Sequence, residues 1–101
     1  MPYIKKQQRE HFDSSIEHLS MLARNWGSKD SEPNEGDLNY IITRLLALAY
    51  NMAEDPRYHK INAIVGILEC IKLEFYRRSA AGYEDIKAVE NGDVLEYKRS
   101  K

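Results

Sequence analysis

Polar and basic side chains interrupt the most apolar segment of this chain. The segment, Ile61 to Val94, reads INAIVGILECIKLEFYRRSAAGYEDIKAVENGDV and carries amide, carboxylate, ammonium, phenol and guanidinium groups. Guanidinium and ammonium groups bind phosphate oxygens, and a tyrosine ring stacks on a flat aromatic ligand. These residue types are therefore candidates for a site that holds a phosphorylated, base-containing ligand.

The spacing of the polar residues places them on the flanks of two predicted helices. One flank of the third predicted helix carries Asn62, Glu69, Lys72 and Tyr76. The helix before it has a polar flank with Asn39, Thr43 and Tyr50. Antiparallel packing across the short connection would turn the two flanks toward each other. The candidate ligand-binding residues are Asn39, Thr43, Asn62, Glu69, Lys72, Tyr76, Arg77, Arg78 and Tyr83.

Two interpretations of this constellation stay open. In the structural one, Glu69 and Lys72 form an ion pair three residues apart, and the amides and hydroxyls satisfy one another beside a core or at a subunit boundary. Buried polar groups are usually there to be satisfied, which favours this interpretation. In the functional one, the same groups line a small pocket, the cations neutralise an anion, and Tyr76 or Tyr83 stacks on its ring.

The two adjacent arginines have a similar pair of interpretations. Arg77 and Arg78 point about 100° apart on a helix, so they do not grip one group within a single subunit. In a homo-oligomer, symmetry brings copies of the same arginine to one interface, where they bind phosphate bidentately. The alternative, which the charge pattern favours, is that both arginines complement the dipole near a helix C-terminus and remain solvated.

Other site chemistries have weak support. The three histidines and Cys70 lie in different segments without the close spacing of a zinc site. Cys70 stands in an apolar stripe, as expected of a small core residue. No glycine-rich phosphate loop is present in the sequence. We therefore expect no catalytic residue, no metal and no cofactor.

One enzyme class is kept as the least favoured alternative, the magnesium-dependent all-helical nucleotide pyrophosphohydrolases. Such enzymes bind the metal through paired acidic residues on helices. Here Glu69 and Glu74 diverge by about 140° on a helix. Glu90 and Asp93 stand on either side of a helix-ending glycine. The acids therefore do not pair in the required way.

Hydrophobic periodicity predicts three main helices. Apolar residues three and four apart predict the first from about Ser14 to Asn25, with Asp13 as its cap. Leucines and isoleucines after Gly36 predict a second, largely buried helix that Asp37 caps. A third helix starts at Asp55 and Pro56, and its apolar residues exceed what one neighbour would cover. A second contact surface is therefore predicted on this helix.

The C-terminal stretch YEDIKAVENGDVLEY fits either a shorter helix that ends at Asn91 and Gly92 or a hairpin that turns there. Its charges do not alternate as in a half-buried strand, which favours the helix. The chain is predicted to be a single helical domain, 1–101. Within it we expect an N-terminal arm at 1–12, a mobile loop at 27–36 and a tail at 93–101.

Composition limits the class of protein. The chain has 101 residues, 43% hydrophobic and 31% charged, with a formal net charge of -1, as in an ordinary soluble globular domain. No basic field favours nucleic acid, and no apolar run approaches the length of a membrane-spanning helix. The single cysteine excludes an internal disulfide and fits a reducing compartment. The predicted location is the cytoplasm.

Several motifs resemble a family of short helical proteins of unknown function from bacteria and their phages. They are the MPYI start, GDLNYIITRLL at Gly36 to Leu46, INAIVGILECIKLEFYRR, YED and ENGDV. The family commonly has a proline just before Tyr-Glu-Asp, where this chain has Gly82, so the exit from the third helix is less rigid here. The resemblance implies a compact helical protein of phage origin and supplies no catalytic residues.

Together these patterns predict an all-α fold, a small bundle of three main helices plus a short C-terminal helix. The chain is predicted to assemble as a homo-oligomer, because helices two and three carry excess apolar surface. The predicted function is non-catalytic binding, in which the oligomer interferes with a host by sequestering a phosphorylated nucleotide-type signal in an interface pocket. The alternative is an adaptor or inhibitor that binds a host protein.

Overall fold

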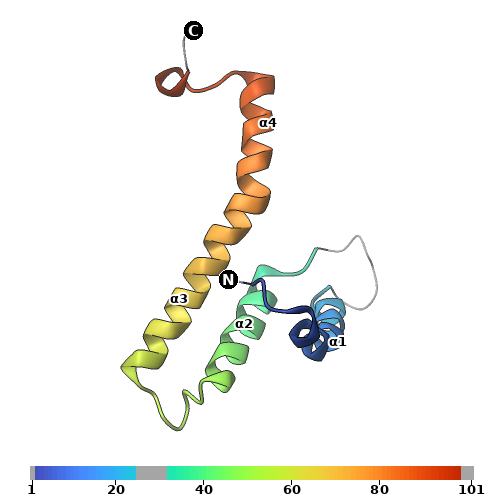
Figure 1. Ribbon diagram of the computed structural model, residues 1–101, viewed down its shortest axis with the longest axis vertical. Helices are drawn as coiled ribbons and strands as arrows, with labels where there is room; N and C mark the ends of the chain where they lie inside the picture. The colour runs from blue at the N-terminus through green and yellow to red at the C-terminus, as the bar shows by residue number, and fades with distance from the viewer. Residues whose placement is uncertain (1, 25–31, 99–101) are drawn as a thin grey trace. The chain divides into compact units, whose positions relative to one another are not determined.

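Every regular element of the described residues is helical. The computed structural model describes residues 2–24 and 32–98, and no strand occurs within them (Figure 1). The α-helices are α1 (Lys6–Ala23), α2 (Glu35–Ala49), α3 (Tyr58–Phe75) and α4 (Ala81–Asn91). A π-helical turn, η1 (Tyr76–Ala80), joins α3 to α4, and a 3₁₀ turn, η2 (Leu95–Tyr97), follows α4. The prediction of an all-α fold is confirmed.

The chain divides within α3 into two units. The first, Pro2–Ile64, contains α1, α2 and the first turns of α3. The second, whose described part is residues 65–98, contains the remainder of α3 together with η1, α4 and η2.

Helix α1 begins at Lys6 rather than at Ser14, so the predicted start is wrong. The backbone amide of Lys5 donates to the Gln8 side chain at 3.2 Å, which satisfies one amide at this end of the helix. The residues that follow are good helix formers, so the helix continues through Asp13 without needing it as a cap. Half of the predicted mobile loop, residues 27–31, lies outside the described residues, and the last two residues of the loop belong to α2.

Helix α2 begins at Glu35, and Asn34 caps it in place of the predicted Asp37. The Asn34 side chain accepts a hydrogen bond from the Gly36 amide at 2.7 Å. Asp37 lies inside the first turn, where its carboxylate complements the positive end of the helix dipole. The prediction failed because both residue types suit a cap and the asparagine comes first.

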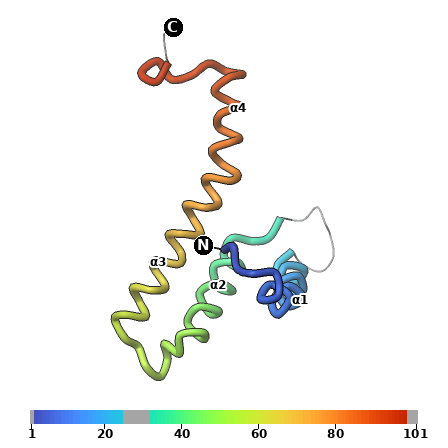
Figure 2. Tube along the Cα trace, in the orientation of Figure 1, coloured from blue at the N-terminus to red at the C-terminus, as the bar shows by residue number. Residues whose placement is uncertain are grey.

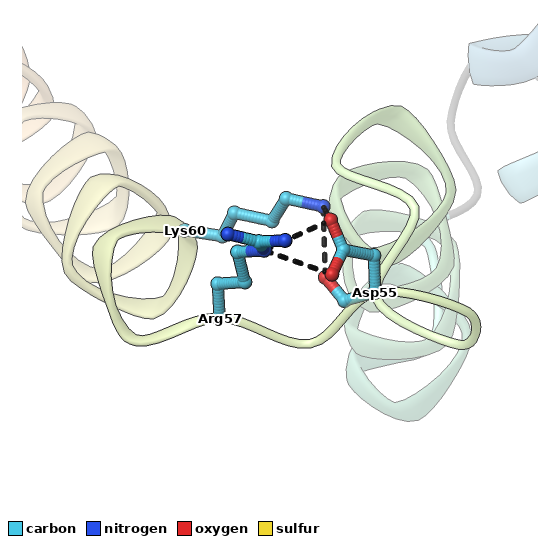
Figure 3. A network of polar contacts seen from close by, with 3 residues as sticks. All are labelled: Asp55, Arg57 and Lys60. Carbon is cyan, nitrogen blue, oxygen red and sulfur yellow. Dashed lines mark hydrogen bonds and ion pairs between the residues drawn. The ribbon is translucent and has the colours of Figure 1, made fainter.

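Helix α3 begins at Tyr58, after the predicted start at Asp55 and Pro56. The Arg57 carbonyl accepts from the amides of Lys60 and Ile61 at 3.1 and 3.2 Å, so Arg57 stands at the helix entrance. The Asp55 carboxylate instead accepts hydrogen bonds from the Arg57 and Lys60 side chains (Figure 3). Asp55 therefore fastens the connection between α2 and α3 and does not cap the helix.

The backbone remains helical from Tyr58 to Asn91 (Figure 2). The predicted separation between the third helix and the shorter C-terminal helix is absent. The segment Ser79–Gly82 contains no proline, so every residue keeps its amide donor and the helix is not broken there. The backbone departs from α-helical geometry only in the π-helical turn η1. The prediction of a helix over a hairpin is confirmed. It ends at Asn91, where Gly92 has a φ of 88°.

Apolar side chains of the helices stay in contact with solvent. Among the described residues, Ala23 alone is buried. Helix α2 has no buried residue, and Leu48 is 65% exposed, so the prediction of a largely buried second helix is wrong for the single chain. Hydrophobic periodicity predicts which side chains form an apolar face, but it does not predict which surface packs against that face.

Candidate functional site

Two of the predicted site cations form ion pairs along the helix that carries them. Lys72 Nζ lies 3.1 Å from a Glu69 carboxylate oxygen, three residues before it. Arg77 makes a closer pair, because its Nη2 donates to both Glu74 oxygens, at 2.8 and 3.2 Å. The Arg77 Nε donates to the same carboxylate at 3.2 Å. The predicted Glu69–Lys72 pair is therefore present, and Arg77 is held by a carboxylate that the sequence analysis did not assign to it.

The π-helical turn brings Tyr76 and Glu84 into line. The Tyr76 hydroxyl donates to a Glu84 carboxylate oxygen at 3.4 Å, although the two residues are eight apart. In an uninterrupted α-helix they would point about 80° away from each other. A π turn bonds residue i to residue i+5 and takes up an extra residue, which removes most of that angle. The contact joins η1 to α4 along one flank of the helix.

Arg78 and Tyr83 are the remaining candidates on this segment, and both are exposed. Arg78 makes no ion pair with another described residue, in contrast to Lys72 and Arg77. Tyr83 is 62% exposed, and the Lys87 ammonium lies 5.7 Å from its ring centroid. Lys87 also pairs with Glu90 at 3.2 Å. An unpaired guanidinium and an exposed aromatic ring thus occur on one continuous helix.

The remaining candidates belong to the first unit. The Thr43 hydroxyl donates to the Asn39 side chain at 3.3 Å, one helical turn away on α2, and both residues are exposed. Asn62 is exposed near the start of α3. The structure therefore joins Asn39 to Thr43 and, separately, Glu69 to Lys72. The grouping of all nine candidates into one site remains a prediction.

Two polar clusters were missed in the sequence analysis. Arg44 lies over the Tyr40 ring, with 5.8 Å from the guanidinium carbon to the ring centroid. Its Nη1 also donates to the Tyr40 hydroxyl at 3.4 Å. The four-residue spacing of these two side chains on a predicted helix was the available signal.

The second missed cluster surrounds Asp55. Arg57 Nε donates to its two carboxylate oxygens at 2.9 and 3.1 Å. Lys60, whose side chain is 15% exposed, donates to the Asp55 backbone carbonyl at 2.8 Å and lies 3.3 Å from its carboxylate. The Arg57 hydrogen bond, followed by that of Lys60, lowers the pKa of Asp55 below its ordinary value. Asp55 was predicted to cap the helix because it precedes Pro56, so its binding of Arg57 and Lys60 was not predicted.

Other chemistries find little support in the described residues. They hold no cluster of three or more histidine, cysteine or acidic side chains arranged to bind a metal ion. Cys70 is exposed rather than placed in a core, so that prediction is wrong for the single chain. None of the described helices combines the length and the apolar character that spanning a membrane requires.

Comparison with known proteins identifies a family. The family model described as Domain of unknown function (DUF6899) matches residues 1–94, which include α1 to α4. No curated protein and no solved structure matches the chain. The expected resemblance to a family of unknown function is therefore confirmed at the level of the family.

Proposed function

The chain belongs to the DUF6899 family, and on that premise we propose that it is a non-catalytic binding protein whose copies associate and hold a phosphorylated, nucleotide-type ligand between them. The observation that carries the proposal is the combination on residues 65–91 of exposed apolar side chains with the unpaired Arg78 guanidinium. The apolar surface favours association, and the guanidinium favours an anion at the place where copies meet.

Arg78 is the principal ligand contact in this proposal. A guanidinium that no carboxylate holds can take a phosphate bidentately without first breaking an ion pair. Arg77 is already bound by Glu74, so recruiting it would sacrifice those hydrogen bonds. Tyr83 supplies an exposed ring on which a base can stack. Lys72 and Tyr76 complete the polar surroundings, because both side chains are exposed.

Because the proposed protein does not convert its ligand, its role would be to sequester that ligand. A protein that binds a nucleotide signal and releases it unchanged lowers the free concentration of that signal, and a phage would use it against its host. The place of action would be the host cytoplasm. An adaptor that covers its apolar residues with a host protein is the competing function, and the same exposed side chains favour it.

Titration calorimetry against linear and cyclic mono- and dinucleotides tests the proposal. We expect one class to bind and, on recovery, to have an unchanged mass. Arg78→Ala should weaken its binding by about ten- to a hundredfold, the cost of a charge-assisted hydrogen bond. Arg77→Ala should weaken it less, and Lys98→Ala, which removes an exposed cation outside the helix, should leave it unchanged.

Two results would contradict the proposal. If no nucleotide binds and a stable complex with a host protein is recovered, the adaptor function replaces it. If a nucleotide is hydrolysed only when magnesium is added, the pyrophosphohydrolase class replaces it. Circular dichroism of each variant shows whether the helices persist, so that a loss of binding is not a loss of fold.

A further inference from the structure

We propose that the helix from Val65 to Asn91 pairs antiparallel with the same helix of a second copy, about a twofold axis between Arg77 and Arg78. This pairing rests on the self-association in the proposed function and specifies its register. It does not depend on which ligand binds.

The π-helical turn assembles the face that would meet the second copy. In an uninterrupted α-helix, Tyr83 would point about 80° away from Phe75. It would then lie off the apolar stripe that includes Leu68, Ile71 and Phe75. The extra residue in η1 rotates α4 back by most of this angle, as the Tyr76–Glu84 hydrogen bond shows for an equal spacing. Tyr83 then shares a face with Phe75.

The apolar face that results is exposed along its whole length. Its residues, with their exposed fractions, are Leu68 41%, Ile71 55%, Phe75 69% and Tyr83 62%, and Ile86, 59% exposed, lies at its edge because the same rotation sets it about 80° from Phe75. Burying a leucine, isoleucine or phenylalanine side chain removes apolar surface from water, which favours association. A second copy doubles the number of such side chains that become buried, because each copy contributes the same face.

The positions of these residues are symmetric about the centre of the helix. Leu68 and Ile86 stand nine residues to either side of Arg77, and Ile71 and Tyr83 stand six residues to either side. Antiparallel copies centred there therefore place Leu68 opposite the second copy's Ile86 and Ile71 opposite its Tyr83. Both layers are apolar, as a stable helix pair requires.

The charges on one flank are symmetric about Arg78, one residue later, and each matches a residue of opposite sign. Lys72 and Glu84 stand six residues to either side of Arg78, and Glu69 and Lys87 stand nine. Antiparallel pairing sets Lys72 against the second copy's Glu84 and Glu69 against its Lys87. Parallel pairing would instead place each residue opposite the identical residue of the second copy, so that like charges face each other. Charge therefore selects the antiparallel arrangement.

The centre of the pair bears on ligand binding. Arg78 lies beside the proposed axis, so each dimer brings two copies of this unpaired guanidinium to one neighbourhood. Their mutual repulsion weakens the pair unless an anion neutralises them. A phosphate group at the axis would supply that neutralisation, which connects the pairing to the proposed ligand.

Cross-linking of mixed variants tests the register. In a Cys70→Ala background, Leu68→Cys and Ile86→Cys chains of different tag length are mixed and treated with a short bismaleimide. We expect a covalent product that contains one chain of each kind, and little product from either chain alone. Adducts only between like chains would show a parallel pair. An oligomer that forms no adduct between positions 68 and 86 would show another register, and either result overturns the pairing while self-association stands.

Charge reversal gives an independent measurement without new cysteines. Lys72→Glu should weaken self-association roughly tenfold in sedimentation equilibrium, since it creates two like-charge contacts per dimer. Adding Glu84→Lys to the same chain restores both contacts in an antiparallel pair and should recover the wild-type association constant. A double variant as weak as the single one overturns the pairing. A wild-type chain that stays monomeric overturns both the pairing and the proposed association.

Discussion

Gly66 shows how a single residue can limit the stability of an exposed helix. It lies within α3, and a methyl group at this position would meet no described residue within 4 Å other than its own helix and chain neighbours. Glycine in a helix costs about 0.5 to 1 kcal/mol relative to alanine, because it loses more backbone entropy on folding. The glycine therefore has no visible packing role in the single chain.

We predict that Gly66→Ala raises the free energy of unfolding by about 1 kcal/mol. Gly92→Ala is the matched opposite case, since its φ of 88° strains any residue with a Cβ, and it should lower stability. Urea unfolding followed by circular dichroism measures both. If Gly66→Ala destabilises the protein, another backbone packs closely against α3 at that position in the assembly.

The connection between α2 and α3 belongs to the scale of elements. Asp55 holds it by binding Arg57 and Lys60, and these hydrogen bonds lower the pKa of its carboxyl group. A carboxyl with a lower pKa in the folded chain adds stability that is fully present above the unfolded value of about 3.9. That stability is lost as the pH falls further, through the folded pKa.

We predict that Arg57→Ala raises the pKa of Asp55 toward its ordinary value, because it removes the largest cause of the shift. A carboxyl carbon titration by nuclear magnetic resonance measures the change, and Arg24→Ala serves as a control that removes an arginine from outside the cluster. An Asp55 pKa that is the same in wild type and Arg57→Ala would show that the ion pair does not persist in solution.

The limits of the individual helices were less predictable than their existence. Periodicity identified the apolar stripes of α2 and α3, because a buried face needs apolar residues at helical spacing. The helix starts depended instead on local competition, in which Asn34 capped α2 ahead of Asp37. Several residue types suit a cap, so a sequence with several candidates does not show which one is used.

At the scale of the whole molecule, exposed apolar side chains favour association. We predict a mass above the 11.8 kDa of one chain in light scattering at micromolar concentration. Ile71→Glu should reduce the mass toward that of the monomer, because it places a charge on the apolar face. Glu96→Lys, an exposed change in η2, serves as the control. A wild-type mass of one chain at high concentration would contradict the prediction.

Association should also respond to anions. Pyrophosphate that binds only the associated form shifts the equilibrium toward it by mass action. We predict that saturating pyrophosphate strengthens self-association roughly tenfold over sodium chloride of equal ionic strength, and that Arg78→Ala removes this difference. Sedimentation equilibrium in the two salts measures it. An equal effect of both salts on the wild type would indicate screening alone.

The sequence by itself determined that the protein is helical and which residues form the apolar stripes, and it offered the Glu69–Lys72 pair as one of two interpretations, since all three depend on spacing along one helix. Only the structure showed which of the possible cation partners are used and how α4 is rotated relative to α3. Glu74 binds Arg77, Arg78 has no ion-pair partner among residues 2–24 and 32–98, and a π-helical turn aligns Tyr76 with Glu84. The physical reason is that an i to i+5 turn changes the phase of every later residue, and no residue type in the Tyr76–Ala80 segment signals it.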